Sequence, residues 1–264
     1  MKFQVLLSIM NSKNPKNHLK KMNIKQNYIV INQVTNSDIK LTNKSENFNK
    51  IVSLKDSGLS KSRNMAILNS EADIGLLSDD DMYYVDDFEK IIINSYDKHK
   101  DADIIAFSIE YEDNSIRKKV FKEGKINFLK SLKLSSVQLS INLNSVKKSN
   151  IVFDEKFGSG SKYFMGEENI FLSDCLKKGL KIYYVPIKIG TLKANSDSKW
   201  FKGYNKEYFK SKGAVFYRIS KRIYILLIVQ FALRKVKLYH KNMSVLNAIK
   251  FMLEGVKDYE KEIK

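Results

Sequence analysis

Short apolar segments alternate with longer stretches of helical spacing through the first 190 residues, and this alternation most constrains the fold. Apolar residues recur at three- and four-residue spacing in 59–69, 85–98 and 168–178, which predicts helices. Strands are predicted at 4–9, 28–32, 50–54, 73–78, 103–110, 137–142 and 181–189. Strands that alternate with helices are joined by crossovers, so we expect an α/β domain with a mostly parallel central sheet flanked by helices.

An acidic cluster, Asp79, Asp80 and Asp81, follows directly after the predicted strand 73–78. In open α/β sheets, ligands bind beyond the carboxyl ends of strands. Adjacent carboxylates repel one another, and Mg²⁺ or Mn²⁺ shared with substrate phosphates would stabilise them. The alternative is a solvated acidic loop, or a cap for the helix that begins near residue 85. These residues alone favour neither interpretation.

A basic segment lies at the start of the predicted helix 59–69. Asp56 and Gly58 belong to a turn, and we expect Ser60 to cap the helix. Lys61 and Arg63 in the first turn would suit an anion or nucleotide site. The alternative is an ordinary capped helix with solvated cations, and taken alone the segment favours that alternative.

A second acidic pair, Glu167 and Glu168, opens the predicted helix 168–178 after Gly166 and a turn-rich loop at 153–160. Acids in a first helical turn ordinarily complement the helix dipole. A catalytic role needs one carboxylate to face a cleft, with a pKa suited to accepting a proton. Adjacent acids diverge on a helix, so one could act as a base while the other positions a ligand.

Together these segments resemble, in order and spacing, the family-2 glycosyltransferases with the GT-A nucleotide-sugar fold. The elements that carry the resemblance are the strand 5–10, the G-x-S-x-x-R-N pattern at 58–64, the strand ending in a DxD-type motif at 76–81 and the acidic pair at 166–168. The resemblance is closest to bacterial capsular and cell-surface polysaccharide transferases, in which FDExFGxG precedes the acidic pair. It implies a GT-A catalytic domain over residues 1–215.

The resemblance also implies an activity, namely inverting transfer of a sugar, most often from a UDP-sugar, to a hydroxyl of a lipid-linked glycan acceptor. Glu168 would be the base, and Glu167 would orient hydroxyl groups. The other implied roles are donor binding by Ser8, Met10, Asp56, Lys61, Arg63, Asp79 and Asp80, acceptor binding by Gly166 and Trp200, and binding of Mn²⁺ or Mg²⁺ by Asp79 and Asp81.

The metal motif departs from the family pattern in two ways. A shift by one residue would place Ser78 in the first position of the motif. Many GT-A enzymes also use a late histidine as a metal ligand, whereas His18, His99 and His240 all lie elsewhere. The resemblance therefore leaves two alternatives: the metal is held chiefly by Asp81 and the donor diphosphate, or it is bound weakly.

Positive charge is concentrated at the C-terminus. The chain carries a net charge of +18, and residues 201–264 hold fifteen Lys and Arg against five Asp and Glu. The apolar run 223–233 lies among these cations, but as a helix it would rise only about 16 Å, too short to span a bilayer. It is either an interior helix with snorkelling cations or a helix lying on an anionic membrane. We favour the second: a basic amphipathic extension, 216–264, that docks a cytoplasmic enzyme on the inner face of the plasma membrane.

The rival class is a polybasic protein that binds nucleic acid or membrane without catalysis. A nucleic-acid-binding protein would interleave cations with exposed aromatic residues on its folded domain. Here the excess cations lie beyond the acidic motifs, so we expect no nucleic-acid partner. The single cysteine, Cys175, cannot form an internal disulfide.

Overall fold

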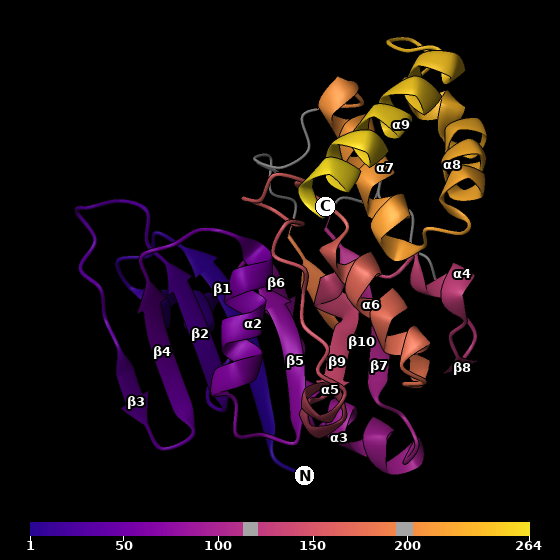
Figure 1. Ribbon diagram of the computed structural model, residues 1–264. Coiled ribbons are helices and arrows are strands. Elements are labelled where there is room, and N and C mark those ends of the chain that lie inside the picture. The colour runs from indigo at the N-terminus through magenta and orange to yellow at the C-terminus, as the bar shows by residue number, and fades with distance from the viewer. Residues whose placement is uncertain (113–120, 194–202) are drawn as a thin grey trace.

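The computed structural model describes residues 1–112, 121–193 and 203–264, and it has a mixed α/β architecture around one central sheet (Figure 1). Within these residues the sheet has the strand order β3-β4-β2-β1-β5-β9-β7-β10-β6, and β8 pairs with β10. The central strands β4, β2, β1 and β5 are parallel, as are β7 and β10. Strand β9 lies antiparallel between β5 and β7. The predicted α/β class with a mostly parallel sheet is confirmed.

The elements have the following bounds. The strands are β1 Phe3–Met10, β2 Tyr28–Gln33, β3 Lys44–Glu46, β4 Asn49–Leu54, β5 Ile74–Asp79, β6 Met82–Tyr84, β7 Ile104–Tyr111, β8 Gly124–Lys125, β9 Leu139–Asn142 and β10 Ile182–Leu192. The helices are α1 Pro15–Lys21, α2 Leu59–Asn69, α3 Phe88–Lys98, α4 Phe128–Ser131, α5 Leu143–Lys148, α6 Glu167–Lys177, α7 Lys206–Ile219, α8 Tyr224–Tyr239 and α9 Val245–Glu262.

One predicted strand, 137–142, is shorter than its apolar pattern indicates. Residues Ser136–Gln138 form a 3₁₀ turn, and β9 begins only at Leu139. The side chain of Gln138 accepts a hydrogen bond from the Ser135 backbone N–H and donates one to the carbonyl of Phe107. These bonds hold the backbone in a turn just before the strand starts.

The sheet is buried on both faces, as expected for parallel strands covered by helices. Along β1, Val5, Leu7 and Ile9 belong to one apolar cluster, whereas Leu6 belongs to the cluster on the other face. Helix α2 supplies Ala66 and Ile67 to the Leu6 side. The carboxyl ends of the parallel strands are thus held in fixed positions by two packed layers.

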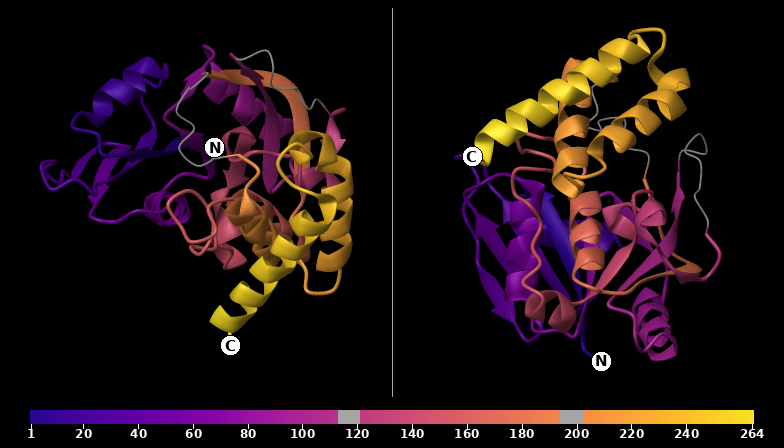
Figure 2. Two further views of the ribbon diagram at one scale, coloured as in Figure 1. Left: turned by 90° about the horizontal axis from the view of Figure 1, so that it is seen from above. Right: turned by 45° about the vertical axis from the view of Figure 1, so that its right-hand side comes forward.

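Helices α7, α8 and α9 lie together at one end of the molecule (Figures 1 and 2). They share a third apolar cluster with Ile170 of α6. A Cβ on Gly213 would lie 1.8 Å from the Met252 carbonyl oxygen, and one on Gly255 would lie 1.9 Å from that of Lys210. The two glycines therefore allow α7 and α9 to cross with their backbones in contact.

The boundary expected after residue 215 falls inside a helix. Helix α7 is continuous from Lys206 to Ile219, and residues on both sides of that position, Phe209 and Ile219 among them, pack into the same cluster. The change in composition therefore lies within one continuous helix, and the division into two domains stays a prediction.

The apolar run 223–233 falls in α8 and divides between two environments. Leu227, Ile228 and Phe231 are buried against the neighbouring helices, whereas Leu226 and Leu233 are exposed. In the described ranges, none of the helices is long and apolar enough to cross a membrane. The run therefore packs on one side and presents apolar surface on the other.

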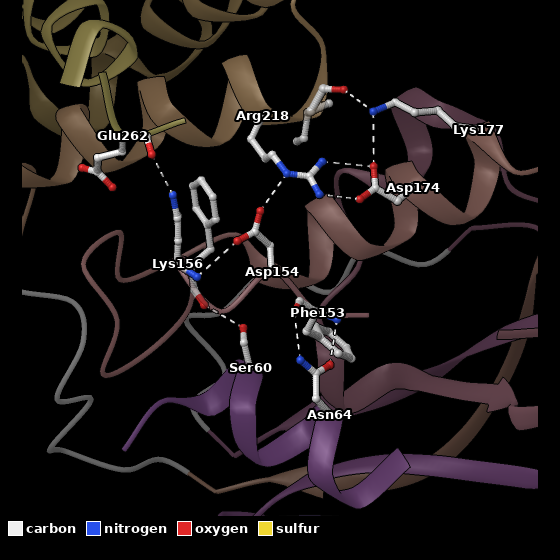
Figure 3. A network of polar contacts seen from close by, with 11 residues as sticks. Ser60, Asn64, Phe153, Asp154, Lys156, Asp174, Lys177, Arg218 and Glu262 are labelled. Carbon is white, nitrogen blue, oxygen red and sulfur yellow. Dashed lines mark hydrogen bonds and ion pairs between the residues drawn. The ribbon is translucent and has the colours of Figure 1, made fainter. Parts of the chain in front are cut away.

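Arg218 anchors the C-terminal helices to the rest of the chain (Figure 3). Its Nε donates to Asp154 Oδ2 at 2.7 Å, and its Nη2 donates to Asp174 Oδ2 at 2.9 Å. Lys177 Nζ also donates to the carbonyl of Ile219 at 2.6 Å. These bonds join the end of α7 to α6 and to the loop that begins at residue 153.

Candidate active site

The polar residues of the 58–64 pattern attach α2 to distant parts of the chain. Ser60 Oγ donates to the carbonyl of Phe157 at 2.6 Å, and Ser62 Oγ donates to Ser8 Oγ at 2.8 Å. Asn64 Nδ2 donates to the carbonyl of Phe153, whose N–H donates back to Asn64 Oδ1 (Figure 3). The expected capping role of Ser60 is wrong, because Gly58 occupies the N-cap position and the Ser60 hydroxyl bonds to the facing loop.

Arg63 brings the three motifs together. Only 1% of its side chain is exposed, and among the described residues its Nε has no hydrogen-bond partner. Its Nη1 donates to Glu167 Oε1 at 2.8 Å, and its Nη2 donates to Asp79 Oδ1 at 3.1 Å. Nη2 also donates to Ser136 Oγ at 2.8 Å. Arg63 is thus buried between the two carboxylates, and its predicted role toward the donor stays a prediction.

Asp79, Asp80 and Asp81, which we call the acid loop, lie at the end of β5 and directly after it. Asp79 is the last residue of β5 and pairs in register with Ser8 on β1. Asp80 is exposed, and its Oδ2 lies 3.6 Å from His18 Nδ1. Asp81 Oδ1 is buried with no hydrogen-bond partner among the described residues. Burial and the neighbouring charges of Asp79 and Asp80 raise the pKa of Asp81 to about 6. A cation next to Asp81 would relieve both effects.

The donor set fits a divalent cation only together with oxygens from a ligand. The carboxylate of Asp79 accepts a hydrogen bond from Arg63. Asp81 Oδ1 is buried and has no hydrogen-bond partner among the described residues, so it is the oxygen of the acid loop that is available to a cation. In the part of the chain that the structure describes, no group of three or more His, Cys, Asp or Glu could hold a metal. Mg²⁺ and Mn²⁺ commonly bind one or two carboxylates and complete their coordination with substrate phosphates and water.

The two acids at the start of α6 have different surroundings, as their divergence on a helix predicts. Glu167 is buried and is held by Arg63, and Gly158 lies so close that a Cβ there would be 3.2 Å from Glu167 Cδ. Glu168 is half-buried. Burial and the charge of Glu167 raise the pKa of Glu168 to about 8, against the opposing charges of Arg63 and Lys212. A carboxyl with this pKa can exchange a proton near neutral pH.

Gly166 has a structural reason to be glycine. It is the N-cap of α6 with φ 81°, and a Cβ there would lie 2.8 Å from Val215 Cγ2. Its small size thus lets α7 approach the start of α6. Contact between Gly166 and an acceptor stays a prediction.

Of the remaining predicted residues, those that the structure describes do not bond to Arg63. Lys61 and Asp56 pair with each other at 2.9 Å on the surface, and this contact lowers the pKa of Asp56. Met10 is exposed at the end of β1. Trp200 lies outside the described residues. Their predicted roles toward donor and acceptor stay predictions.

Three residues near the motifs were not predicted from the sequence patterns. Ser136 reaches Arg63 from the 3₁₀ turn, His18 reaches Asp80 from α1, and Lys212 influences Glu168 from α7. No local pattern distinguishes them from surface serine, histidine and lysine residues. Only the folded chain brings them next to the motifs.

Solved structures of TarS from S. aureus have a similar fold. The structure of TarS 1-349 in complex with UDP-GlcNAc matches with a TM-score of 0.67 and 15% identity, covering 97% of this chain and 82% of that chain. The complex with UDP matches with a TM-score of 0.64, covering 97% and 81%. The chain has the GT-A fold. A longer TarS structure matches with a TM-score of 0.61, and 44% of it is covered.

The match confirms the GT-A fold that the sequence motifs predict. No protein-family model matches the sequence, and no curated protein matches it. At 15% identity the likeness to TarS is one of fold. Assignments within the GT-A site therefore depend on the residues and contacts described above.

Proposed function

We propose that the chain is an inverting glycosyltransferase of bacterial surface polysaccharide synthesis that uses a UDP-sugar donor and a glycan hydroxyl as acceptor. The observation that carries this proposal is the contact of buried Arg63 with both Asp79 and Glu167. One guanidinium thereby places the acid loop next to the acidic pair. The similarity to TarS structures that contain UDP-GlcNAc and UDP supports a nucleotide-sugar donor.

In the proposed reaction, Glu168 accepts the proton of the acceptor hydroxyl. The hydroxyl oxygen forms a bond to the anomeric carbon from the face opposite UDP, the bond to UDP breaks, and the configuration inverts. General-base assistance of this kind contributes about 10²–10⁴-fold. Glu167, whose carboxylate is held by Arg63, is suited to orient the hydroxyl groups of donor or acceptor.

The donor diphosphate is assigned to the ends of β1 and β5, near Ser8, Met10 and the acid loop. Asp81, together with Asp79, would hold Mn²⁺ or Mg²⁺, and such a cation would offset the negative charge that develops on the leaving diphosphate. The buried, unpartnered oxygen of Asp81 supports this assignment. Asp80, which is exposed, would contact the donor from the outer side of the loop.

A donor-hydrolysis screen tests the proposal. UDP-, GDP- and TDP-sugars are incubated with the protein, with and without Mn²⁺, and release of the nucleotide is measured. We expect hydrolysis of a UDP-sugar that depends on Mn²⁺ and is lost in Asp81→Asn. Glu207→Gln is a control, because Glu207 is an exposed acid on α7, outside the acid loop. The absence of both hydrolysis and binding for every donor would refute the proposed function.

We also propose that the enzyme works at the inner face of the plasma membrane on a polyprenyl-diphosphate-linked acceptor. The exposed face of α8 supports this, because Ile225, Leu226 and Leu233 are 57%, 66% and 59% exposed. Arg222 and Lys237 flank these apolar side chains, a combination that suits an anionic bilayer.

Co-sedimentation with vesicles tests the membrane proposal. Leu226→Ser/Leu233→Ser should reduce sedimentation with anionic vesicles. Leu68→Ser/Leu129→Ser removes two equally exposed leucines, 71% and 63%, from the rest of the molecule and should leave binding intact. Equal sedimentation of the wild-type protein with neutral and anionic vesicles would contradict the proposal.

A further inference from the structure

Two groups among the cations of the C-terminal helices differ in their partners. In the first, each cation has an acidic partner that joins one helix to another segment. Lys206 pairs with Glu254 at 3.4 Å, and Lys210 pairs with Asp258 at 2.6 Å, so these pairs join α7 to α9. Arg218 joins α7 to Asp154 and Asp174 in the same way. This group is explained by helix packing.

The second group, Lys212, Arg234 and Lys235, has no ion pair within the described ranges 1–112, 121–193 and 203–264. Lys212 Nζ lies 5.5 Å from the ring centres of both Phe216 on α7 and Phe231 on α8. Lys235 follows Phe231 by one helical turn on the same face of α8, and Arg234 is its neighbour. We call these three residues the α7–α8 cation cluster.

The α7–α8 cation cluster lies near the first turn of α6. A Cβ on Gly166, the N-cap of that helix, would be 2.8 Å from Val215 Cγ2, and Lys212 is three residues before Val215 on α7. The pKa of Lys212 agrees with this position, because burial and the charges of Lys235 and Arg234 lower it whereas Glu168 and Glu167 oppose the effect. Like charges gathered in this way repel one another, and a bound anion would relieve the repulsion.

We propose that the α7–α8 cation cluster binds a phosphate group of the acceptor, next to the hydroxyl that Glu168 deprotonates. A phosphate offers several oxygens and up to two charges, which match the fork of Arg234 and the two ammonium groups. The proposal rests on the proposed function, because it takes Glu168 as the base. It makes the acceptor a phosphorylated glycan, either a soluble sugar phosphate or a lipid-linked sugar diphosphate.

The position of the cluster favours the acceptor over the donor. The donor diphosphate is assigned to the ends of β1 and β5, where the acid loop lies. The cluster comes from α7 and α8, and Glu168 interacts with Arg63 from α2 as well as with Lys212 from α7. A phosphate on the cluster therefore approaches Glu168 from the C-terminal helices.

Calorimetric titration with UDP and Mn²⁺ already saturating tests this site while the donor site is filled. The probes are glucose 1-phosphate, a soluble sugar phosphate, and farnesyl diphosphate, a prenyl diphosphate. We expect Arg234→Gln/Lys235→Gln to weaken binding of at least one probe by about tenfold or more. Lys241→Gln/Lys250→Gln removes two exposed cations from the same end of the chain and should bind the probe like the wild type.

The outcomes separate this proposal from the proposed function. Loss of probe affinity in Arg234→Gln/Lys235→Gln, with UDP affinity unchanged, supports an acceptor phosphate site, and the probe that binds more tightly identifies the source of the phosphate. Failure of both probes to bind the wild-type protein overturns the inference, as does equal binding by the two double variants. Loss of UDP affinity in Arg234→Gln/Lys235→Gln would also overturn it, because the cluster would then belong to the donor. The proposed function fails separately, if the wild-type protein neither binds UDP nor hydrolyses any donor.

Discussion

Arg63 and Arg218 each bind two carboxylates from distant segments, yet their surroundings differ. Arg63 is 1% exposed, and the acids next to its partners, Asp81 and Glu168, both have raised pKa values. The Arg218 side chain is 28% exposed, and its bonds to Asp154 and Asp174 fasten one helix to the others. An arginine–carboxylate network by itself therefore does not mark a functional site. The acids with raised pKa values next to the partners of Arg63 distinguish the candidate active site from the network of Arg218.

The largest expected effect is the loss of Arg63. Arg63→Met leaves Asp79 and Glu167 without their shared cation, and removal of one partner from a buried ion pair typically costs about 3–5 kcal/mol. We expect a large fall in the free energy of unfolding, measured by urea denaturation, together with loss of donor hydrolysis. Arg63→Lys should recover only part of the stability, because an ammonium cannot reproduce the planar fork. A small change in Arg63→Met would remove the distinction between the two arginines.

Substitution of the proposed base should affect the reaction more than the fold. Glu168→Gln preserves the shape of the side chain but cannot accept the proton, so kcat should fall by about 10²–10⁴-fold. Calorimetry should show nearly unchanged affinity for UDP and Mn²⁺. A Glu168→Gln enzyme with the wild-type kcat would show that another group is the base.

Arg218→Met should have a smaller effect. Its partners are only partly buried, so solvent screens the interaction, and we expect a loss of about 1 kcal/mol in the free energy of unfolding. UDP affinity should be retained, because the acid loop lies outside this network. If Arg218→Met abolished UDP binding while the protein stayed folded, the contrast with Arg63 would be wrong.

The smallest expected effect is a change in the pH dependence of kcat, and the pKa of Glu168 predicts its direction. With a pKa of about 8, the reactive carboxylate of Glu168 becomes populated as the pH rises through that value, so kcat should rise with it. Glu167 raises this pKa, whereas Arg63 and Lys212 lower it. Lys212→Met should therefore move the rise to higher pH, and Lys237→Met should leave it in place. A profile that is flat or falls through this range would contradict the role of Glu168.

Much of the framework could be predicted from local patterns. The helix at 59–69 was predicted with the bounds that it has, and strands form at each of the predicted positions. Helix periodicity and strand burial depend on residues close in sequence, so a single sequence contains them. The polar contacts of Ser60 and Gln138 were missed, because their partners Phe157 and Phe107 are brought near only by folding.

The amino-acid sequence alone specifies the α/β class, the order of the motifs and the presence of excess acids after a strand and at a helix start. These depend on residue type and spacing along the chain. Folding alone buries Arg63 between Asp79 and Glu167 and brings Glu168 under the influence of the Lys212 charge. Such contacts join residues far apart in the chain, and their burial determines which charges are paired and which stay free for a ligand.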